Sequence, residues 1–484
     1  MNGLSQKRYL ELPLPTEDDP RSDQQRILDS LAAAGVEERV HIPVHILRQL
    51  YPLLDNAKWK ITVSLAWNGE NWEMVEIEEG DTTAQHYGLA VDLGSTTVVA
   101  RLLDCNSGEI LKEVSSFNKQ IQWGTDILSR IFYCKDNKEK LEEVRRATVE
   151  SICECMDKLD ASHSALSMVI AGNTTMIHFL LGMDAFCVFY TPHAVHADRP
   201  GFQLARDLDI PLKGYVYCYP AKSNYLGGDI ISGMIDTELY KKNEISVFFD
   251  IGTNGELVIG NKEFLLCGAG AAGPALEGGV VRTGMRAEAG AVDEVKIRDG
   301  NIYVHVIGSH KEDSGSHEKN SGNHEDNSSG EEPQGICGSG IIDLIAELFL
   351  EGWIDIRGKL SPEKSPLIQE RDNQFCVEYA PGLYFYQKDI DEFIRTKSAA
   401  HTMVEIMLRE SGLDLNQADR FYVAGAFGKH VSKESAITIG MYPDMDRDHI
   451  INAGNSSLEG AQKLLLNRSL LTDIDQIQIG RAHV

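Results

Sequence analysis

The sequence predicts an α/β protein with two lobes of similar architecture, preceded by a small α+β domain. An acidic, glycine-tipped stretch occurs twice, as AVDLGSTTVV at residues 90–99 and as FFDIGTNGEL at residues 248–257. Each copy opens the same succession of strand, glycine-rich turn, strand and helix, the first over residues 87–240 and the second over residues 246–478. Because such elements pack in layers, the repetition predicts two lobes with duplicated mixed sheets.

The segment before the first lobe divides into a linker and the small domain. Residues 1–22 are rich in proline and acid and predict an extended linker. Apolar residues recur on one side of residues 23–34, which predicts a helix, and residues 45–54 predict a second, short helix. The following run alternates on both sides of Asn68-Gly69, a dipeptide typical of hairpin turns. Residues 23–84 are therefore expected to form the small α+β domain.

Composition and charge exclude several classes of function. The chain has 484 residues, and its 73 acidic against 46 basic side chains give a net charge of −27. This charge repels nucleic-acid phosphates, so we expect no nucleic-acid partner. Nine scattered cysteines without a C-x-x-C pair suit a reducing compartment. The amino terminus lacks the apolar core of a signal peptide, and no apolar run approaches the ~18 residues of a membrane helix. We expect a cytoplasmic protein.

Two segments depart from the pattern of the lobes. Residues 308–328 carry a seven-residue unit three times without any apolar side chain, so this period cannot form a coiled-coil seam. We expect a disordered, solvated insert at residues 308–334; weak metal binding by His310, His317 and His324 is the alternative. The last six residues, IGRAHV, match the translation of a sequencing adapter, so residues 479–484 are expected to be non-native.

The doubled hairpin has the chemistry of a phosphate-binding loop. In each copy a strand ends in a carboxylate, Asp92 or Asp250, and the chain then turns tightly through a glycine. Backbone N–H groups and Ser or Thr hydroxyls around such a turn converge on one point, which suits a phosphate. The aspartate supplies hard oxygens for Mg²⁺ through its waters, or orients an attacking water. We expect both lobes to present these loops to the same nucleotide.

A third segment near the carboxyl end suits the base or ribose of that nucleotide. The sequence DRFYVAGAFGKHV holds an apolar strand at Phe421–Val423, followed by the small residues of Gly425-Ala426-Phe427-Gly428. Small residues let a ring lie against the backbone. A plain turn between a strand and a helix is the alternative explanation of the same residues.

These motifs and their order resemble one known family. The string AVDLGSTT, VIAGNTTMIHFLLG, FFDIGTNGEL, GPALEGG, GMRAEAGAV, GICGSGIIDL, VAGAFG and NAGNSSLEGA resembles the ASKHA-type ATPase domain of reductive activators of corrinoid proteins. The superfamily also holds acetate and sugar kinases, Hsp70 and actin. The likeness covers residues 87 to about 468, and residues 1–84 resemble the linker and middle domains of the same activators.

The resemblance implies an activity, partners and cofactors. Such activators use ATP to restore Co(I) in corrinoid methyl-carrier proteins that have oxidised to Co(II). It implies ATP and Mg²⁺ as ligands, and as partners a corrinoid protein or its methyltransferase and a separate ferredoxin-type electron donor. Nothing here resembles the amino-terminal [2Fe–2S] domain of these activators, so we expect no iron–sulfur cluster in this chain. A homodimer is compatible with the sequence.

The resemblance also assigns roles to individual residues. Asp92 and Asp250 would be catalytic and would hold Mg²⁺ through water. An interdomain segment near the nucleotide is implied at Gly172, Asn173 and Thr174. The nucleotide itself would be bound by a first phosphate loop at Gly94, Ser95, Thr96 and Thr97, a second at Gly252, Thr253 and Asn254, and an adenosine segment at Gly425, Ala426 and Gly428.

Three other functions use the same fold and stay open at this point. One is a small-molecule kinase, and another is a nucleotide-dependent partner-binding protein without redox activity. The third is an activator of 2-hydroxyacyl-CoA dehydratases, in which cysteines of two subunits hold a [4Fe–4S] cluster. For that cluster, Cys267 and Cys337 are the candidates in glycine-rich turns.

Overall fold

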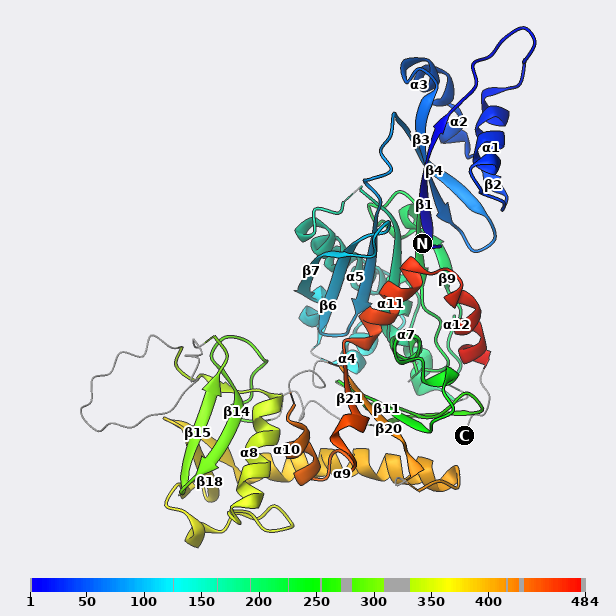
Figure 1. Ribbon diagram of the computed structural model, residues 1–484. Helices are drawn as coiled ribbons and strands as arrows, with labels where there is room; N and C mark the ends of the chain where they lie inside the picture. Colours follow the sequence, from blue (N-terminus) through cyan, green and yellow to red (C-terminus); the bar gives the residue numbers. More distant parts are fainter. Residues whose placement is uncertain are drawn as a thin grey trace, which may run out of the picture. The chain divides into compact units, whose positions relative to one another are not determined.

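The computed structural model divides the chain into two compact units (Figure 1). It describes residues 2–124, 126–162, 164–191, 193–224, 226–252, 255–270, 281–308, 331–414, 417–425 and 431–479. Within these ranges, unit 1 holds residues 2–240 and 456–479, and unit 2 holds residues 241–455. Most of the predicted histidine-containing insert, residues 309–330, and residues 480–484 of the expected non-native tail lie outside the described residues.

The first 84 residues form a four-stranded sheet with three helices on it. The strand order is β1-β3-β4-β2. As predicted, a helix begins at residue 23 and a hairpin turns at Asn68, whose side chain accepts the N–H groups of Glu70 and Asn71. The helix predicted at residues 45–54 is two helices. The elements are β1 (Ser5–Glu11), α1 (Asp23–Ala33), β2 (Val40–His41), α2 (Val44–Leu47), α3 (Leu50–Asn56), β3 (Lys60–Trp67) and β4 (Trp72–Glu79).

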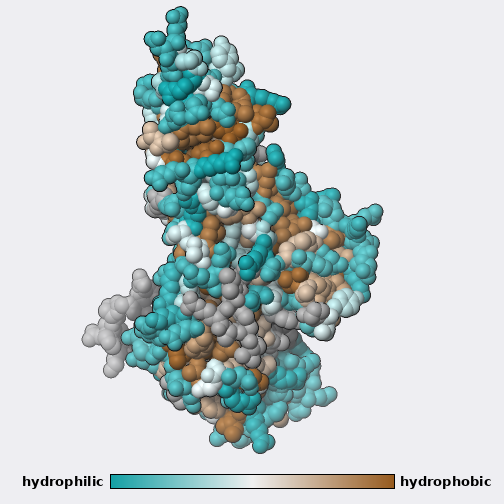
Figure 2. All heavy atoms as spheres, turned by 90° about the vertical axis from the view of Figure 1, so that its right-hand side faces the viewer, coloured by the Kyte–Doolittle hydropathy of each residue, from teal (hydrophilic) through white to brown (hydrophobic). Residues whose placement is uncertain are grey.

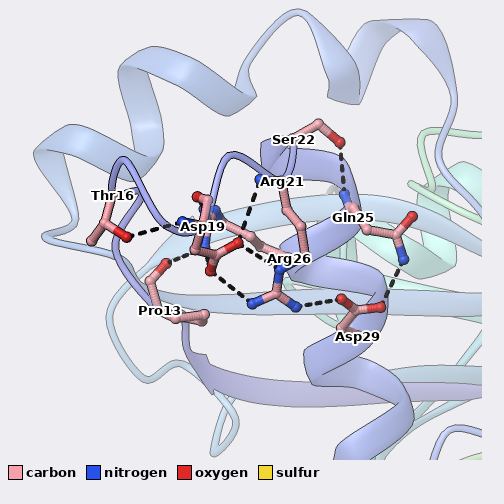
Figure 3. A network of polar contacts seen from close by, with 8 residues as sticks. All are labelled: Pro13, Thr16, Asp19, Arg21, Ser22, Gln25, Arg26 and Asp29. Carbon is pink, nitrogen blue, oxygen red and sulfur yellow. Dashed lines mark hydrogen bonds and ion pairs between the residues drawn. The ribbon is translucent and has the colours of Figure 1, made fainter.

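The prediction of a separate linker at residues 1–22 is wrong. Strand β1 pairs antiparallel with β3 over its whole length, so this segment is an edge of the sheet. The residues after it are fixed by a polar network around Asp19 (Figure 3). Arg21 and Arg26 both donate to the Asp19 carboxylate, and Arg26, which is fully buried, also donates to Pro13 O. Proline and acid in this stretch therefore build a turn that packs on α1.

This network predicts a pH dependence. Hydrogen bonds from Arg21 and then Arg26 hold the pKa of Asp19 well below its usual range. An aspartate in the unfolded chain has a pKa of about 4, so below this pH the unfolded chain binds more protons than the folded one. The stabilisation of the folded state by Asp19 is therefore present above this pH and is lost as the pH falls towards the lower pKa of the folded state. We expect Asp19→Asn to destabilise the domain at pH 7, and the difference from wild type to shrink between pH 4 and pH 2.

Urea unfolding followed by tryptophan fluorescence measures this difference. The small domain holds three of the five tryptophans, Trp59, Trp67 and Trp72, so most of the signal reports on it. Asp18→Asn, at the exposed neighbouring position, is the matched control and should behave as wild type. A difference between Asp19→Asn and wild type that is the same at pH 7 and pH 2 would contradict the role of this carboxylate.

The larger part of unit 1 is a six-stranded mixed sheet with helices packed on it. The strand order is β7-β6-β5-β8-β10-β9. Strands β5, β8 and β10 are parallel to one another, whereas β6 and β7 run antiparallel on the side of β5. The strands are β5 (Tyr87–Leu93), β6 (Thr97–Asp104), β7 (Ile110–Phe117), β8 (Ala165–Gly172), β9 (Gly201–Leu204) and β10 (Tyr215–Cys218). The helices are α4 (Ile127–Cys134), α5 (Lys138–Lys158), α6 (Thr174–Leu180), α7 (Gly228–Thr237), α11 (Ser456–Leu466) and α12 (Leu470–Ile479).

Unit 2 is built on a five-stranded sheet of order β13-β12-β11-β20-β21, with two small sheets beside it. The main strands are β11 (Ser246–Ile251), β12 (Gly255–Gly260), β13 (Leu265–Gly270), β20 (Arg420–Ala424) and β21 (Ile450–Gly454). The small sheets hold β14 (Ala291–Arg298), β15 (Asn301–Val306) and β16 (Gly335–Ile336), and β17 (Ile368–Arg371), β18 (Gln374–Ala380) and β19 (Leu383–Tyr386). The helices are α8 (Gly338–Leu350), α9 (Gln387–Glu410) and α10 (Lys433–Thr438).

The two main sheets confirm the predicted duplication. In each, an antiparallel meander of three strands is followed by two parallel strands, so that β7-β6-β5-β8-β10 corresponds to β13-β12-β11-β20-β21. A long helix, α5 or α9, precedes the corresponding strand β8 or β20. Asp92 lies opposite Ala171 on β8, and Asp250 lies opposite Ala424 on β20. Each carboxylate thus lies near the corresponding end of the corresponding pair of parallel strands, β5 and β8 in unit 1 and β11 and β20 in unit 2.

The structure corrects the predicted boundary of the second lobe. Residues 456–478 were expected there, but α11 and α12 pack in unit 1, where α11 contacts α7, β5 and β8. Arg101 on β6 donates to Glu459 of α11, and the Tyr219 hydroxyl donates to Gly460 O. A side chain at Gly460 would collide with Ser232 O on α7. The apolar face of α11 therefore completes the core of unit 1.

Surface and cysteine chemistry agree with the composition. None of the helices in the described part of the chain is long and apolar enough to cross a membrane. Among the described residues no cysteine forms a disulfide. Figure 2 shows hydrophobic side chains at the surface of the small domain, in the upper part of the view. The exposed large hydrophobic side chains of this domain are Leu14, Val44, Leu47 and Tyr51.

Candidate functional site

The first hairpin, between β5 and β6, turns as the sequence predicts. Asp92 is half-buried one residue before the end of β5, and Gly94 opens the turn. A side chain at Gly94 would collide with the carbonyl oxygen of Thr97, so the tightness of the turn requires glycine. The predicted loop Gly94, Ser95, Thr96 and Thr97 is therefore a compact turn directly after the Asp92 strand end.

Three successive carbonyl groups of this loop are held from one side. Asn118 Nδ2 donates to Gly94 O at 2.9 Å, and the Asn118 backbone N–H donates to Thr96 O at 2.9 Å. Arg130 Nη1 donates to Ser95 O at 2.6 Å. In a trans peptide the C=O and the following N–H point in opposite directions. The N–H groups of residues 95–97 are thereby turned away from Asn118 and Arg130, as a concave anion-binding loop requires.

Arg130 holds this loop in its conformation through hydrogen bonds, and none of the sequence motifs points to it. Its side chain is fully buried on α4, and Nε donates to Gly124 O at 2.9 Å while Nη1 also donates to Gln120 Oε1 at 3.2 Å. Burial lowers the pKa of Arg130 to about 10, so the guanidinium is charged at neutral pH. The signal was an arginine within the apolar helix ILSRIFYC, a position where a buried charge needs acceptors.

Two further residues come to Asp92 from distant parts of unit 1. Ser457 Oγ, in the first turn of α11, donates to Asp92 Oδ1 at 2.9 Å. Asp229 lies in the first turn of α7. Burial, followed by the negative charge of Asp92, raises the pKa of the Asp229 carboxyl well above its usual range. Ser457 lies within the quoted stretch NAGNSSLEGA but had no predicted role, and Asp229 lies in none of the quoted motifs.

The segment at Gly172, Asn173 and Thr174 also lies at this end of the sheet. Gly172 pairs with Leu93 at the end of β8, and Asn173 caps α6 by accepting the N–H of Met176 at 3.0 Å. A side chain at Gly227 would lie 2.5 Å from Asn173 Cα and 2.6 Å from Asp229 Oδ1. Glycine at 227 thus lets α7 begin directly against this segment.

The donor set in unit 1 fits a hydrated divalent cation. Mg²⁺ prefers oxygen ligands and is usually held by one or two carboxylates together with substrate phosphates. Two neighbouring carboxylates that raise each other's cost of ionisation, Asp92 and Asp229, are stabilised by such a charge. Among the described residues no group of three or more His, Cys, Asp or Glu side chains could hold a metal by itself.

Unit 2 brings two of the predicted segments together. Asp250 is half-buried near the end of β11, and Gly425 follows the parallel strand β20. Gly425 has φ +89°, and a side chain on it would lie 2.8 Å from Asp250 Oδ1 and would collide with Ile251 O. Its N–H donates to Gly454 O at 2.9 Å. Gly252 follows β11 directly, whereas Thr253, Asn254, Ala426 and Gly428 lie outside the described residues.

We expect this close packing to make Gly425 sensitive to substitution. Gly425→Ala places a methyl group against the Asp250 carboxylate, and we expect at least a tenfold loss of the ATP hydrolysis that the sequence predicts. Gly382→Ala is the matched control, because Gly382 has φ +73° but no atoms within 4 Å of the added methyl group. Both variants carry the backbone cost of about 1–2 kcal/mol in thermal unfolding. Equal hydrolysis by the two variants would show that residue 425 does not position Asp250.

Each unit therefore presents a strand-end aspartate beside a tight glycine turn and a parallel strand. Three sequence models of one family match almost the whole chain: the RACo linker region at residues 1–84, the RACo middle region at residues 87–242, and the C-terminal ASKHA domain of RACo at residues 244–483. The chain belongs to the RACo family. The ASKHA domain agrees with the duplicated sheets and implies nucleotide binding, as expected from the sequence.

Curated and solved relatives of the RACo-family chain carry matching descriptions. It is 30% identical over 405 residues to the corrinoid activation enzyme RamQ of Eubacterium limosum, covering 79% of this chain and 64% of RamQ. It is 26% identical over 404 residues to the [Co(II) methylated amine-specific corrinoid protein] reductase of Methanosarcina barkeri, covering 81% of this chain and 72% of the reductase. A solved reductive activator for a corrinoid, iron–sulfur protein matches all of this chain and 76% of its own, with 34% identity and a TM-score of 0.87.

Proposed function

We propose that this chain is the ATP-dependent part of a reductive activator that restores Co(I) in a corrinoid protein. The observation that carries the proposal is the pair of equivalent strand-end aspartates, Asp92 in unit 1 and Asp250 in unit 2. The family match and the names of the relatives support the substrate. The chain spans 64% of the length of RamQ, so corrinoid activation by this chain alone is part of the proposal.

In the proposed mechanism the residues of both hairpins act on Mg-ATP. The N–H groups of residues 95–97, fixed by Asn118 and Arg130, bind phosphate oxygens. Asp92, with Ser457 as its hydrogen-bond donor and Asp229 beside it, would hold Mg²⁺ through water. When bound, Mg²⁺ supplies positive charge that neutralises the phosphate oxygens. Asp250 orients the attacking water, and Gly425 leaves space for the nucleoside next to it.

Nucleotide turnover would then control the partner. ATP favours the conformation to which it binds more tightly, and loss of the γ-phosphate removes the contacts that favour this conformation. We propose that a corrinoid protein or its methyltransferase binds a surface that responds to this change. One electron from a separate ferredoxin-type donor reduces Co(II) to Co(I), a step that is uphill for ordinary donors without ATP. The iron–sulfur cluster would belong to the donor and not to the described part of this chain.

The test has two stages. Purified chain with Mg²⁺ and ATP should release phosphate without any phosphorylated acceptor, and phosphate release that strictly requires an acceptor would favour a kinase. A Co(II) corrinoid protein and a ferredoxin-type reductant are then added, and the absorbance of Co(I) is followed. We expect Co(I) only with ATP. Phosphate release without Co(I) would leave a nucleotide-dependent partner-binding protein, and absence of both would refute the proposal.

A further inference from the structure

A pocket in unit 2 is unrelated to the strand ends that carry Asp250. It has a volume of about 310 Å³ and is lined by the end of α8, the loop that follows it, the middle of α9 and the end of α10. These helices lie close together in Figure 1. The volume is at the lower end of the range of about 300–1,000 Å³ that is typical of small-ligand sites. The pocket therefore suits a small molecule.

The walls of the pocket are apolar. Ile345, Ile354 and Phe393 are buried in the core of unit 2 and form its base, while Phe349 and Ile356 are 40% and 90% exposed. The loop after α8 lies directly against α9, because a side chain at Gly358 would collide with Ile394. An aliphatic chain of a ligand would thus bury apolar surface on several sides, at roughly 25 cal/mol per Å².

One cation stands in this apolar pocket. Lys397 of α9 is half-buried, and its Nζ makes no hydrogen bond or ion pair with any residue that the structure describes. Burial lowers the pKa of Lys397. Its ammonium lies against the turn after α10, since a side chain at Gly440 would be 3.1 Å from Nζ. A half-buried ammonium without an anion is costly, and a bound carboxylate would remove that cost.

The neighbouring carboxylates are bound by other groups. On α9, Asp391 pairs with Lys359 at 2.9 Å and Glu392 pairs with Arg395 at 3.0 Å. Asp355 also lines the pocket, but its carboxylate accepts the backbone N–H groups of Arg357 and Lys359 at 2.8 Å each. The anion that pairs with Lys397 therefore has to come from outside the unit. A single negative charge is enough to balance the ammonium group.

We propose that this pocket binds an aliphatic monocarboxylate, with its chain against the isoleucine and phenylalanine side chains and its carboxylate on Lys397. A doubly charged ligand such as a phosphate ester fits less well, because Asp355 lines the same pocket and one ammonium balances one charge. The site is separate from the proposed nucleotide loops. Its occupation does not depend on ATP hydrolysis, so the two proposals can fail independently.

Isothermal titration of the full chain with sodium octanoate tests the proposal. We expect saturable binding to the wild type and at least a tenfold higher Kd for Lys397→Met, which keeps an unbranched side chain only one atom shorter and removes its charge. Lys388→Met is the matched control, because Lys388 is exposed on the same helix outside the pocket lining. It should bind octanoate as the wild type does. Neutral octanamide should bind the wild type at least tenfold more weakly than octanoate.

Several outcomes would overturn the proposal. One is the absence of octanoate binding to the wild type at millimolar concentration, and another is equal affinity in Lys397→Met and wild type. Lys397→Gln provides a second variant, and circular dichroism checks that each variant is folded. If Lys397→Met instead dissociates a wild-type dimer in sedimentation velocity while octanoate has no effect, the pocket is a contact between copies of the chain.

Discussion

Replacing Asp250 by asparagine is expected to lower kcat for ATP hydrolysis by about 10³-fold and to change the Kd for ATP by less than tenfold. The carboxylate at the end of β11 is proposed to orient the attacking water through its negative charge. An asparagine amide has the same shape but no charge, so it cannot take over this role. Most ground-state binding comes instead from backbone N–H groups and apolar contacts, which the substitution leaves in place. Phosphate release and equilibrium ATP binding are measured separately.

A matched control exists in the same unit. Asp299 is an exposed aspartate at the tip of another hairpin, between β14 and β15, so Asp299→Asn makes the same chemical change away from the site. It should hydrolyse ATP as the wild type does. If Asp250→Asn also keeps the wild-type kcat, the proposed role of the second hairpin is wrong, whatever the effect on affinity.

Replacing Arg130 by methionine is expected to weaken ATP binding by about 10²-fold. The substitution removes the donor to Ser95 O and leaves the half-buried Gly124 O and the buried Gln120 Oε1 without this partner. A buried acceptor left unpaired costs about 1–3 kcal/mol, so the loop is expected to leave the conformation that directs its N–H groups to the phosphate. ATP affinity and thermal unfolding are both measured.

Two comparisons separate this effect from general loss of stability. Arg130→Lys keeps a positive charge but not the guanidinium fork that reaches three acceptors, so its ATP affinity should also fall, by a smaller factor. Arg206→Met, at an arginine whose side chain is 75% exposed, should bind ATP normally. A folded Arg130→Met protein with wild-type ATP affinity would show that the loop does not depend on the Arg130 hydrogen bonds.

The parts of the site that lie within one hairpin could be predicted from the sequence. Apolar runs on both sides of Asp-x-Gly specify two strands and a tight turn, and the turn itself positions Asp92 and Asp250 at strand ends. The equivalence of the two sheets followed from the repetition of that pattern. Local sequence therefore determined the fold class and pointed to the two residues on which the proposed function rests.

Residues that reach the site through tertiary packing could not be predicted in this way. Asn118, Arg130, Asp229 and Ser457 come from four different elements, and none has a motif that fixes its distance to Asp92. For the same reason α11 was placed in the wrong lobe. Chain order gives no information on which core the last helices complete, whereas the apolar face of α11 and the collision at Gly460 decide it.

The most direct measurement is a crystal structure of the chain with Mg²⁺ and a non-hydrolysable ATP analogue. The account predicts a nucleotide whose phosphates are within hydrogen-bond distance of the N–H groups of residues 95–97, and carboxylates of Asp92 and Asp250 that both face the nucleotide. A nucleotide that contacts one hairpin alone, or carboxylates at positions 92 and 250 that face away from it, would contradict the account.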